Sequence, residues 1–256
     1  MQTISPARLL LPILLSIAAA VPAADDPATP QALSQPASSD SGQTAQGPST
    51  DAGQPPAPPR FIYQPPNRGV PAQRVGGGTR SITQLDVLAP DHTGLTSQAQ
   101  PRLYWYINPG FRNKVRFRLA EAGVTPPLLE ILLPPEPNGG IQHLDLAVHK
   151  VRLEPGRLYE WGVMLDPFPH QRLPPLASLG RILLDDTTTA LQQASSAHKP
   201  YLAAQLGYWY DALDWVSQQI ETNPPASELR LRRADLLEQG GLLSAALYER
   251  DMTQAR

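Results

Sequence analysis

The 256-residue sequence contains no cysteine, which excludes disulfide bonds, thiolate metal sites and a lipid anchor attached to a cysteine. A strong charge of either sign is also missing. The formal net charge is −2, so no overall field draws the protein to nucleic acid. Beyond the N-terminal apolar run, no segment approaches the ~20 apolar residues of a membrane span. The fold must therefore be stabilised by packing, and we expect no transmembrane anchor in the mature chain.

Catalytic motifs are also absent from the sequence. It has no H-E-x-x-H, no G-x-S-x-G and no thiol nucleophile. A carboxylate pair of the glycosidase kind stays open, because such pairs are not local in sequence. The histidines, none spaced as metal ligands on a helix, are His92, His143, His149, His170 and His198. We therefore predict a protein that is not an enzyme and that binds no metal or cofactor.

The N-terminus has the pattern of a secretory signal peptide. Arg8 precedes an apolar run from Leu9 to Val21, and small residues lead to a cleavage site after Ala23. The run is too short for a stop-transfer helix, and the alternative is a buried N-terminal helix. We expect residues 1–23 to be removed, and the mature protein to be exported to the periplasm.

A linker is expected from residue 24 to residue 66, which is rich in Pro, Ser, Gln, Ala and Thr and has little to bury. The stretch that follows, PPNRGVPAQRVGGGTR, is neither a P-loop nor a dinucleotide fingerprint, because no lysine follows the glycines and a strand-like segment comes next. It is either a glycine-rich lead-in to the sheet or an arginine comb for an anion or partner. The comb consists of Arg68, Arg74 and Arg80. Because side chains alternate in an extended chain, their even spacing would make all three point the same way.

The segment from residue 67 to residue 184 is expected to form an antiparallel, immunoglobulin-like β-sandwich, because its apolar residues mostly alternate and turn signals separate short runs. The stretch LEPGRLYEWGVML is typical of a tyrosine corner. We expect the Tyr159 hydroxyl to bond to the chain upstream and Trp161 to lie in the core.

Two of the expected strands, RLYWYI and KVRFRL, are predicted to form a hairpin around NPGFRN with one outward face. That face is either a solvated surface or a basic-aromatic binding surface. The ligand of such a surface would be an anionic polymer, a lipid head group or an acidic partner. Its residues are Tyr104, Tyr106, Arg112, Lys114, Arg116 and Arg118.

Residues 185–256 are expected to form a short helical module. Gly207 and Ala212 recur 34 residues later as Gly241 and Ala246, which is the tetratricopeptide period. Pro200 must shorten the first helix. One and a half repeats are not stable by themselves, so they must pack against the β-rich part or against a partner. The residues expected to form this interface, or else a peptide groove, are Tyr208, Trp209, Tyr210 and Trp215.

Three blocks occur in a specific order: PNRGVPAQRVGGGTR, LDVLAPDHTGLTSQAQPRLYWYI and YLAAQLGYWYDAL. With them the chain resembles, from about Asn67 onward, the exported bacterial family called domain of unknown function 928. The resemblance implies an envelope location and carries over no catalytic residues. Charge also divides the chain, with thirteen Lys/Arg against nine Asp/Glu in residues 67–184 and six against ten in residues 185–256.

Together these features predict an α+β protein with two modules and no nucleic-acid partner. We expect a noncatalytic adaptor or scaffold that binds an envelope protein. The alternative is a module that binds an anionic envelope polymer or lipid head group. The identity of the partner and the oligomeric state stay open.

Overall fold

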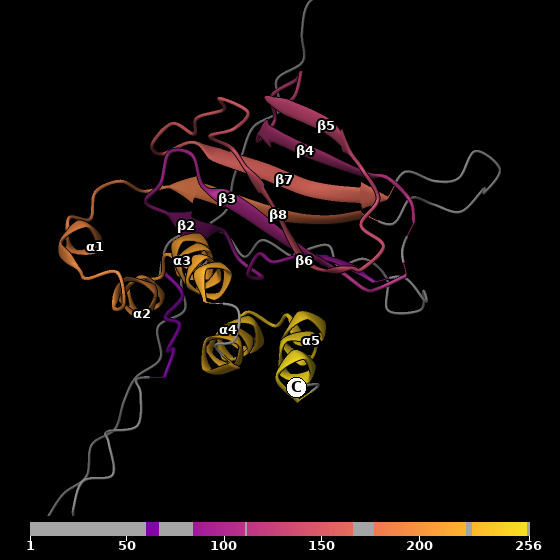
Figure 1. Cartoon of the computed structure of the whole chain (residues 1–256). Helices are drawn as coiled ribbons and strands as arrows, with labels where there is room; N and C mark the ends of the chain where they lie inside the picture. The colour runs from indigo at the N-terminus through magenta and orange to yellow at the C-terminus, as the bar shows by residue number, and fades with distance from the viewer. Residues whose placement is uncertain (1–59, 67–83, 111, 166–176, 224–226, 255–256) are drawn as a thin grey trace, which may run out of the picture. The chain divides into compact units, whose positions relative to one another are not determined.

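Eight β-strands are followed by five α-helices in the described part of the computed structural model (Figure 1). The described residues are 60–66, 84–110, 112–165, 177–223 and 227–254. They belong to one compact unit, Pro55–Arg256. The expected signal peptide, most of the linker and the arginine comb lie outside them. No helix among these residues is long and apolar enough to cross a membrane.

The strands form two sheets. The three-stranded sheet is antiparallel and consists of β1 (Leu85–Val87), β3 (Arg102–Ile107) and β6 (Gly140–Asp145). In the five-stranded sheet the order is β2 (Gly94–Thr96), β8 (Ala177–Leu184), β7 (Leu158–Leu165), β4 (Val115–Glu121) and β5 (Leu129–Leu133). The expected antiparallel arrangement holds for every described pairing except one, because β2 runs parallel to β8.

The core between the sheets follows the alternation of the sequence. Val115, Phe117 and Leu119 of β4 are buried, and the Phe117 ring lies 6.3 Å from Trp105 of the other sheet and 6.0 Å from Trp161 of β7. Trp161 is in the core as predicted. The predicted bond of the Tyr159 hydroxyl is also confirmed, since it accepts a hydrogen bond from the Glu154 backbone N–H at 2.9 Å.

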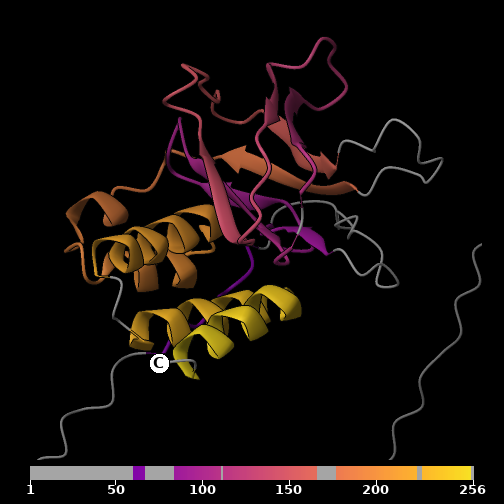
Figure 2. The same cartoon turned by 45° about the vertical axis from the view of Figure 1, so that its right-hand side comes forward.

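The predicted hairpin does not form. The strands β3 and β4 belong to different sheets, where β3 pairs with β1 and β6, and β4 with β5 and β7. One face of the three-stranded sheet packs against the five-stranded sheet and the other against helices, which also contact β2 of the five-stranded sheet (Figure 2). Tyr104 and Tyr106 are therefore only 2% and 7% exposed, and they cannot form an outward face with the cations.

The helices form two hairpins. Gly207 and Gly241, with φ of +83° and +71°, sit at the two turns, where an L side chain would be strained. Pro200 lies in the first turn of the shortened second helix, and Ala212 and Ala246 are buried at the close contacts. The helices are α1 (Ala190–Gln193), α2 (Lys199–Gln205), α3 (Trp209–Thr222), α4 (Ser227–Gln239) and α5 (Leu243–Gln254).

The predicted linker extends too far toward the C-terminus. Phe61 and Tyr63 are 4% and 8% exposed, and the Phe61 ring stacks on Tyr201 at 4.5 Å. Gln239 of α4 holds this segment by accepting from the Tyr63 N–H at 2.8 Å and donating to the Phe61 carbonyl at 3.0 Å. Two large aromatic side chains outweigh the Pro-rich composition around them, so the packed chain begins by residue 60.

Candidate functional site

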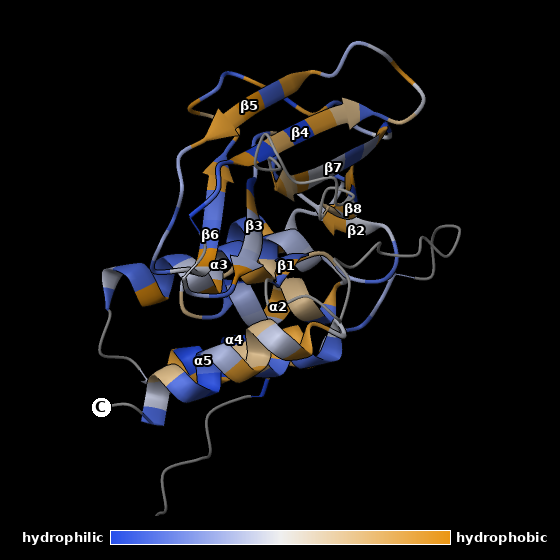
Figure 3. Ribbon diagram, turned by 90° about the vertical axis from the view of Figure 1, so that its right-hand side faces the viewer, coloured by the Kyte–Doolittle hydropathy of each residue, from blue (hydrophilic) through white to orange (hydrophobic). Residues whose placement is uncertain are grey.

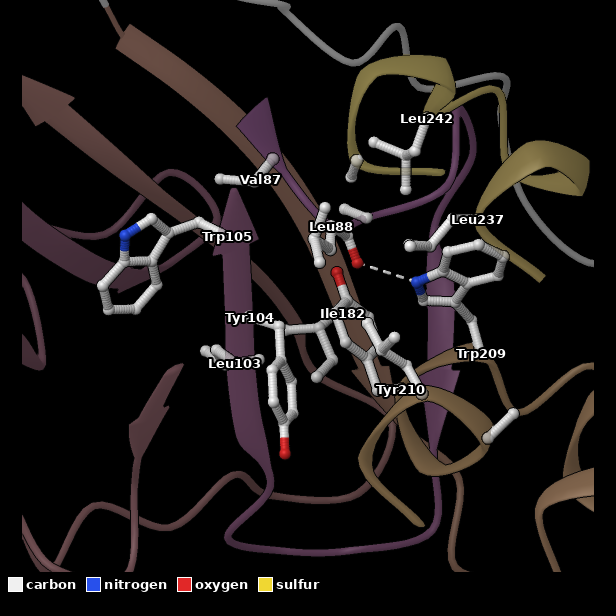
Figure 4. Packing of buried hydrophobic residues seen from close by; sticks show 14 of the residues in the cluster. Val87, Leu88, Leu103, Tyr104, Trp105, Ile182, Trp209, Tyr210, Leu237 and Leu242 are labelled. Carbon is white, nitrogen blue, oxygen red and sulfur yellow. Dashed lines mark hydrogen bonds between the residues drawn. The ribbon is translucent and has the colours of Figure 1, made fainter. Parts of the chain in front are cut away.

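The start of helix α3 joins the helices to the sheets. Trp209 is fully buried, and its indole N–H donates to the Leu88 carbonyl at 2.8 Å (Figure 4). Gly240, which follows α4, lies against the same ring, since a Cβ there would be 2.2 Å from the indole, so one side chain contacts both parts of the fold. Trp215 is only partly buried and lies under the Lys199 ammonium at 5.5 Å.

Tyr210 enters the core beside Trp209. Its hydroxyl accepts from the Trp161 indole N–H and donates to the Arg181 carbonyl, both at 2.9 Å. Burial raises the pKa of Tyr210 above its ordinary value. Tyr208 is also buried, at 5% exposure. Tyr208, Trp209 and Tyr210 are therefore too deeply buried to line a peptide groove.

Two carboxylates of α3 sit in the same interface. Asp211 accepts hydrogen bonds from the Thr96 hydroxyl at 2.7 Å and from the Ser97 N–H at 2.8 Å. Asp214 accepts from the Tyr104 hydroxyl at 2.9 Å. Burial raises the pKa of Asp211, and hydrogen bonds from Ser97 and Thr96 oppose that shift. Both carboxylates are buried and surrounded by protein donors, so their role is to join α3 to the sheets.

Replacing Asp211 with asparagine is expected to lower the free energy of unfolding by about 2–4 kcal/mol. An amide has one acceptor oxygen, and its NH₂ group would face the donors of Thr96 and Ser97. Urea denaturation followed by circular dichroism measures the change. Glu221→Gln on the same helix is the control, because Glu221 is exposed and its ion pair with Arg102 is worth little. Equal effects of the two variants would contradict the assigned role of Asp211.

A cleft of about 420 Å³ opens on the outward face of the five-stranded sheet. Its floor follows from strand parity: every second residue of β4, β7 and β8 points outward, and the register sets these residues side by side. One row is Arg118, Gly162 and Leu179, and the next is Ala120, Glu160 and Arg181. A Cβ at Gly162 would lie 2.4 Å from the Leu179 side chain, so glycine is what lets that leucine lie across β7.

One of the charged side chains that line this cleft has no ion-pair partner among the described residues. Arg181 pairs with Glu160 at 2.9 Å. Glu121, which also lines the cleft, pairs with Arg157 at 3.0 Å. Arg118 makes no hydrogen bond or ion pair with any residue in the described part of the chain. The cleft therefore presents one arginine without an ion-pair partner beside apolar walls.

The loops at the rim complete the cleft. His92, in the loop after β1, shares a 2.7 Å hydrogen bond between its Nε2 and the Tyr63 hydroxyl. Val124, in the loop after β4, is 48% exposed and adds apolar surface. Within the described ranges, no group of three His, Asp or Glu side chains is placed to hold a metal ion.

The structure separates the residues that the sequence placed on one basic face. Arg112 and Lys114 are exposed ahead of β4, Arg116 pairs with Glu130 of β5 at 3.0 Å, and Arg118 lies in the cleft. The other charged groups of the cleft were not predicted from the sequence. Strand parity in β7 and β8 could have pointed to Glu160 and Arg181, whereas no pattern indicated His92.

The family model for a Domain of Unknown Function (DUF928) matches residues 71–249. The chain belongs to the DUF928 family. No curated protein sequence matches this DUF928 chain significantly. Solved structures that match include a multi-domain immunophilin from Arabidopsis thaliana, with 10% identity over 70% of this chain and 99% of that one. The TM-score of 0.17 is too low to indicate a shared fold or activity.

Proposed function

We propose that this DUF928 chain is a noncatalytic adaptor of the bacterial envelope that binds an acidic segment of a partner protein in the cleft of the five-stranded sheet. The observation that carries the proposal is Arg118, an unpaired cation among the described residues, set beside the apolar surfaces of Leu179 and Val124. A carboxylate of the partner would pair with Arg118 while a neighbouring apolar side chain covers the leucine.

The shape and charge of the cleft favour a protein segment over a polymer. A volume of about 420 Å³ with apolar walls suits one or two side chains. A repeating anionic polymer needs a continuous basic surface, but Arg116 is neutralised by Glu130 and the tyrosines point to the helices. Binding of a polymer or lipid head group through Arg112, Lys114 and Arg118 is the second candidate, supported by the exposure of these three cations.

We also propose that the protein is exported, that its sheets form an immunoglobulin-like sandwich and that its helices form a tetratricopeptide-like segment. The signal-peptide pattern of residues 1–23 supports secretion to the periplasm. The facing sheets and the bond to Tyr159 support an immunoglobulin-like sandwich. Two helical hairpins offset by 34 residues support a tetratricopeptide-like segment, a type of module that commonly binds other proteins.

Arg118→Glu is expected to weaken partner binding at least ~10-fold, equivalent to about 1.4 kcal/mol. The reversed charge repels the acidic segment, while the melting temperature stays unchanged because the side chain is exposed. A partner is first captured from cell envelopes with the tagged mature protein, and its affinity is then measured by calorimetry. Arg152→Glu is the matched control, since Arg152 is exposed and lies outside the cleft.

Salt dependence separates the two candidates. Polymer binding should weaken steeply between ~50 and ~200 mM salt and should respond equally to Arg112→Glu and Lys114→Glu. Docking in the cleft should depend mainly on Arg118 and only moderately on salt. If Arg118→Glu and Arg152→Glu bind the captured partner equally well, the cleft is not the binding site.

A further inference from the structure

The strand β5 lies at one edge of the five-stranded sheet. It pairs with β4, and no strand in the described part of the chain pairs with its other side. Figure 3 shows β5 at this edge, hydrophobic along its length except for one polar position. Leu128 and Leu132 are 48% and 42% exposed. An edge of this kind presents backbone N–H and C=O groups that can bind another strand.

The usual protections of a sheet edge are missing within β5. Such edges carry lysines, prolines or bulges that prevent pairing. Here the one charge, Glu130, is paired with Arg116 of the neighbouring strand. Prolines flank the strand at residues 126–127 and 134–135 but do not interrupt it. The prolines limit any added pairing to about the length of β5 itself.

We propose that β5 pairs antiparallel with β5 of a second copy of this chain, about a two-fold axis at Ile131. In this register Ile131 lies opposite its own mate, Leu129 opposite Leu133 and Glu130 opposite Leu132. All five residues are then paired, and no like charges meet. An axis at Glu130 would set two carboxylates against each other, and an axis at Leu132 would bring Pro134 opposite Glu130.

The second copy also covers an incomplete part of the core. Leu129, Ile131 and Leu133 point to the inner side of the sheet but are only partly buried. Continuing the sheet places the same apolar row of the second copy beside them. Five residue pairs bury less surface than a standard interface of about 1,600 Å², so the dimer forms and dissociates with concentration.

The chain has no cysteine, so single substitutions give a clean cross-linking test. Ile131→Cys in the mature protein should form a covalent dimer under mild oxidation. Cross-strand neighbours at the axis have Cα atoms about 4.5–5.5 Å apart, within disulfide range. Leu132→Cys is the control, because its mate lies diagonally on the far side of the axis, beyond about 7 Å. The readout is the dimer band on a non-reducing gel.

Sedimentation equilibrium tests the same register without a cross-link. In the Leu132→Glu variant, the new carboxylate lies opposite Glu130 of the second copy. The repulsion between these two charges should weaken dimerisation at least ~10-fold. Leu132→Lys removes the same apolar side chain but faces Glu130 with an opposite charge, so it should retain the dimer. A wild-type protein that is monomeric up to ~1 mM, or equal weakening by both variants, overturns the proposal. A cross-link through Leu132→Cys in place of Ile131→Cys overturns it as well.

Discussion

Trp209→Ala is expected to lower the free energy of unfolding by about 3–5 kcal/mol, the usual cost of truncating a buried aromatic residue. The substitution removes a ring that touches both the sheets and the helices, together with the hydrogen bond to the Leu88 carbonyl. It also leaves a cavity beside Gly240, whose α-carbon lies so close to the indole that a Cβ there would be 2.2 Å from it. The sheets and helices should still melt in one transition, about 10 °C lower.

Two variants show whether the position of the ring matters. Trp215→Ala removes the same side chain from a partly buried site on the same helix, so it should cost clearly less. Trp209→Phe keeps most of the packing and loses the hydrogen bond, and should fall between the two. Scanning calorimetry and urea denaturation measure all three. If Trp209→Ala is no more destabilising than Trp215→Ala, the interface assigned to Trp209 is wrong.

The double variant Phe61→Ala with Tyr63→Ala is expected to cost about 4 kcal/mol or more, because it removes two buried rings from one short segment. The Tyr63 ring meets Trp209 edge-on at 5.0 Å, and the Phe61 ring stacks on Tyr201. Without these contacts the segment should detach from α4. Limited proteolysis should then cut within residues 60–66, whereas in the wild-type protein this segment should resist cleavage.

Ile62→Ala is the matched control for the double variant. Ile62 lies between the two aromatic residues in sequence but is 54% exposed, so its truncation should change the free energy of unfolding by less than about 1 kcal/mol. Denaturation curves of the three proteins, read with their proteolytic patterns, make the comparison. A double variant as stable and as protease-resistant as Ile62→Ala would show that residues 60–66 do not belong to the folded part.

The candidate site was only partly predictable. The alternation of β4 predicted Arg118 as an outward residue, and the structure places it in the cleft. Strand parity would have marked Arg181 as an outward residue of β8, but not that β4, β7 and β8 lie side by side. His92 could not be predicted, because it reaches the cleft from a distant loop. Tyr104 was predicted from the sequence as a surface residue, but its side chain contacts α3.

The sequence by itself determined local structure and family. Alternation placed the longer strands, Pro200 shortened α2, and Gly207 and Gly241 marked the helical turns, because these effects depend on a few neighbouring residues. Only the tertiary structure decided which strands pair. Alternation states which side chains share a face, but not which strand lies beside it or what covers the second face. Helices cover the second face of β3, whereas the outward face of β4 lines a cleft, so two similar strands have different surroundings.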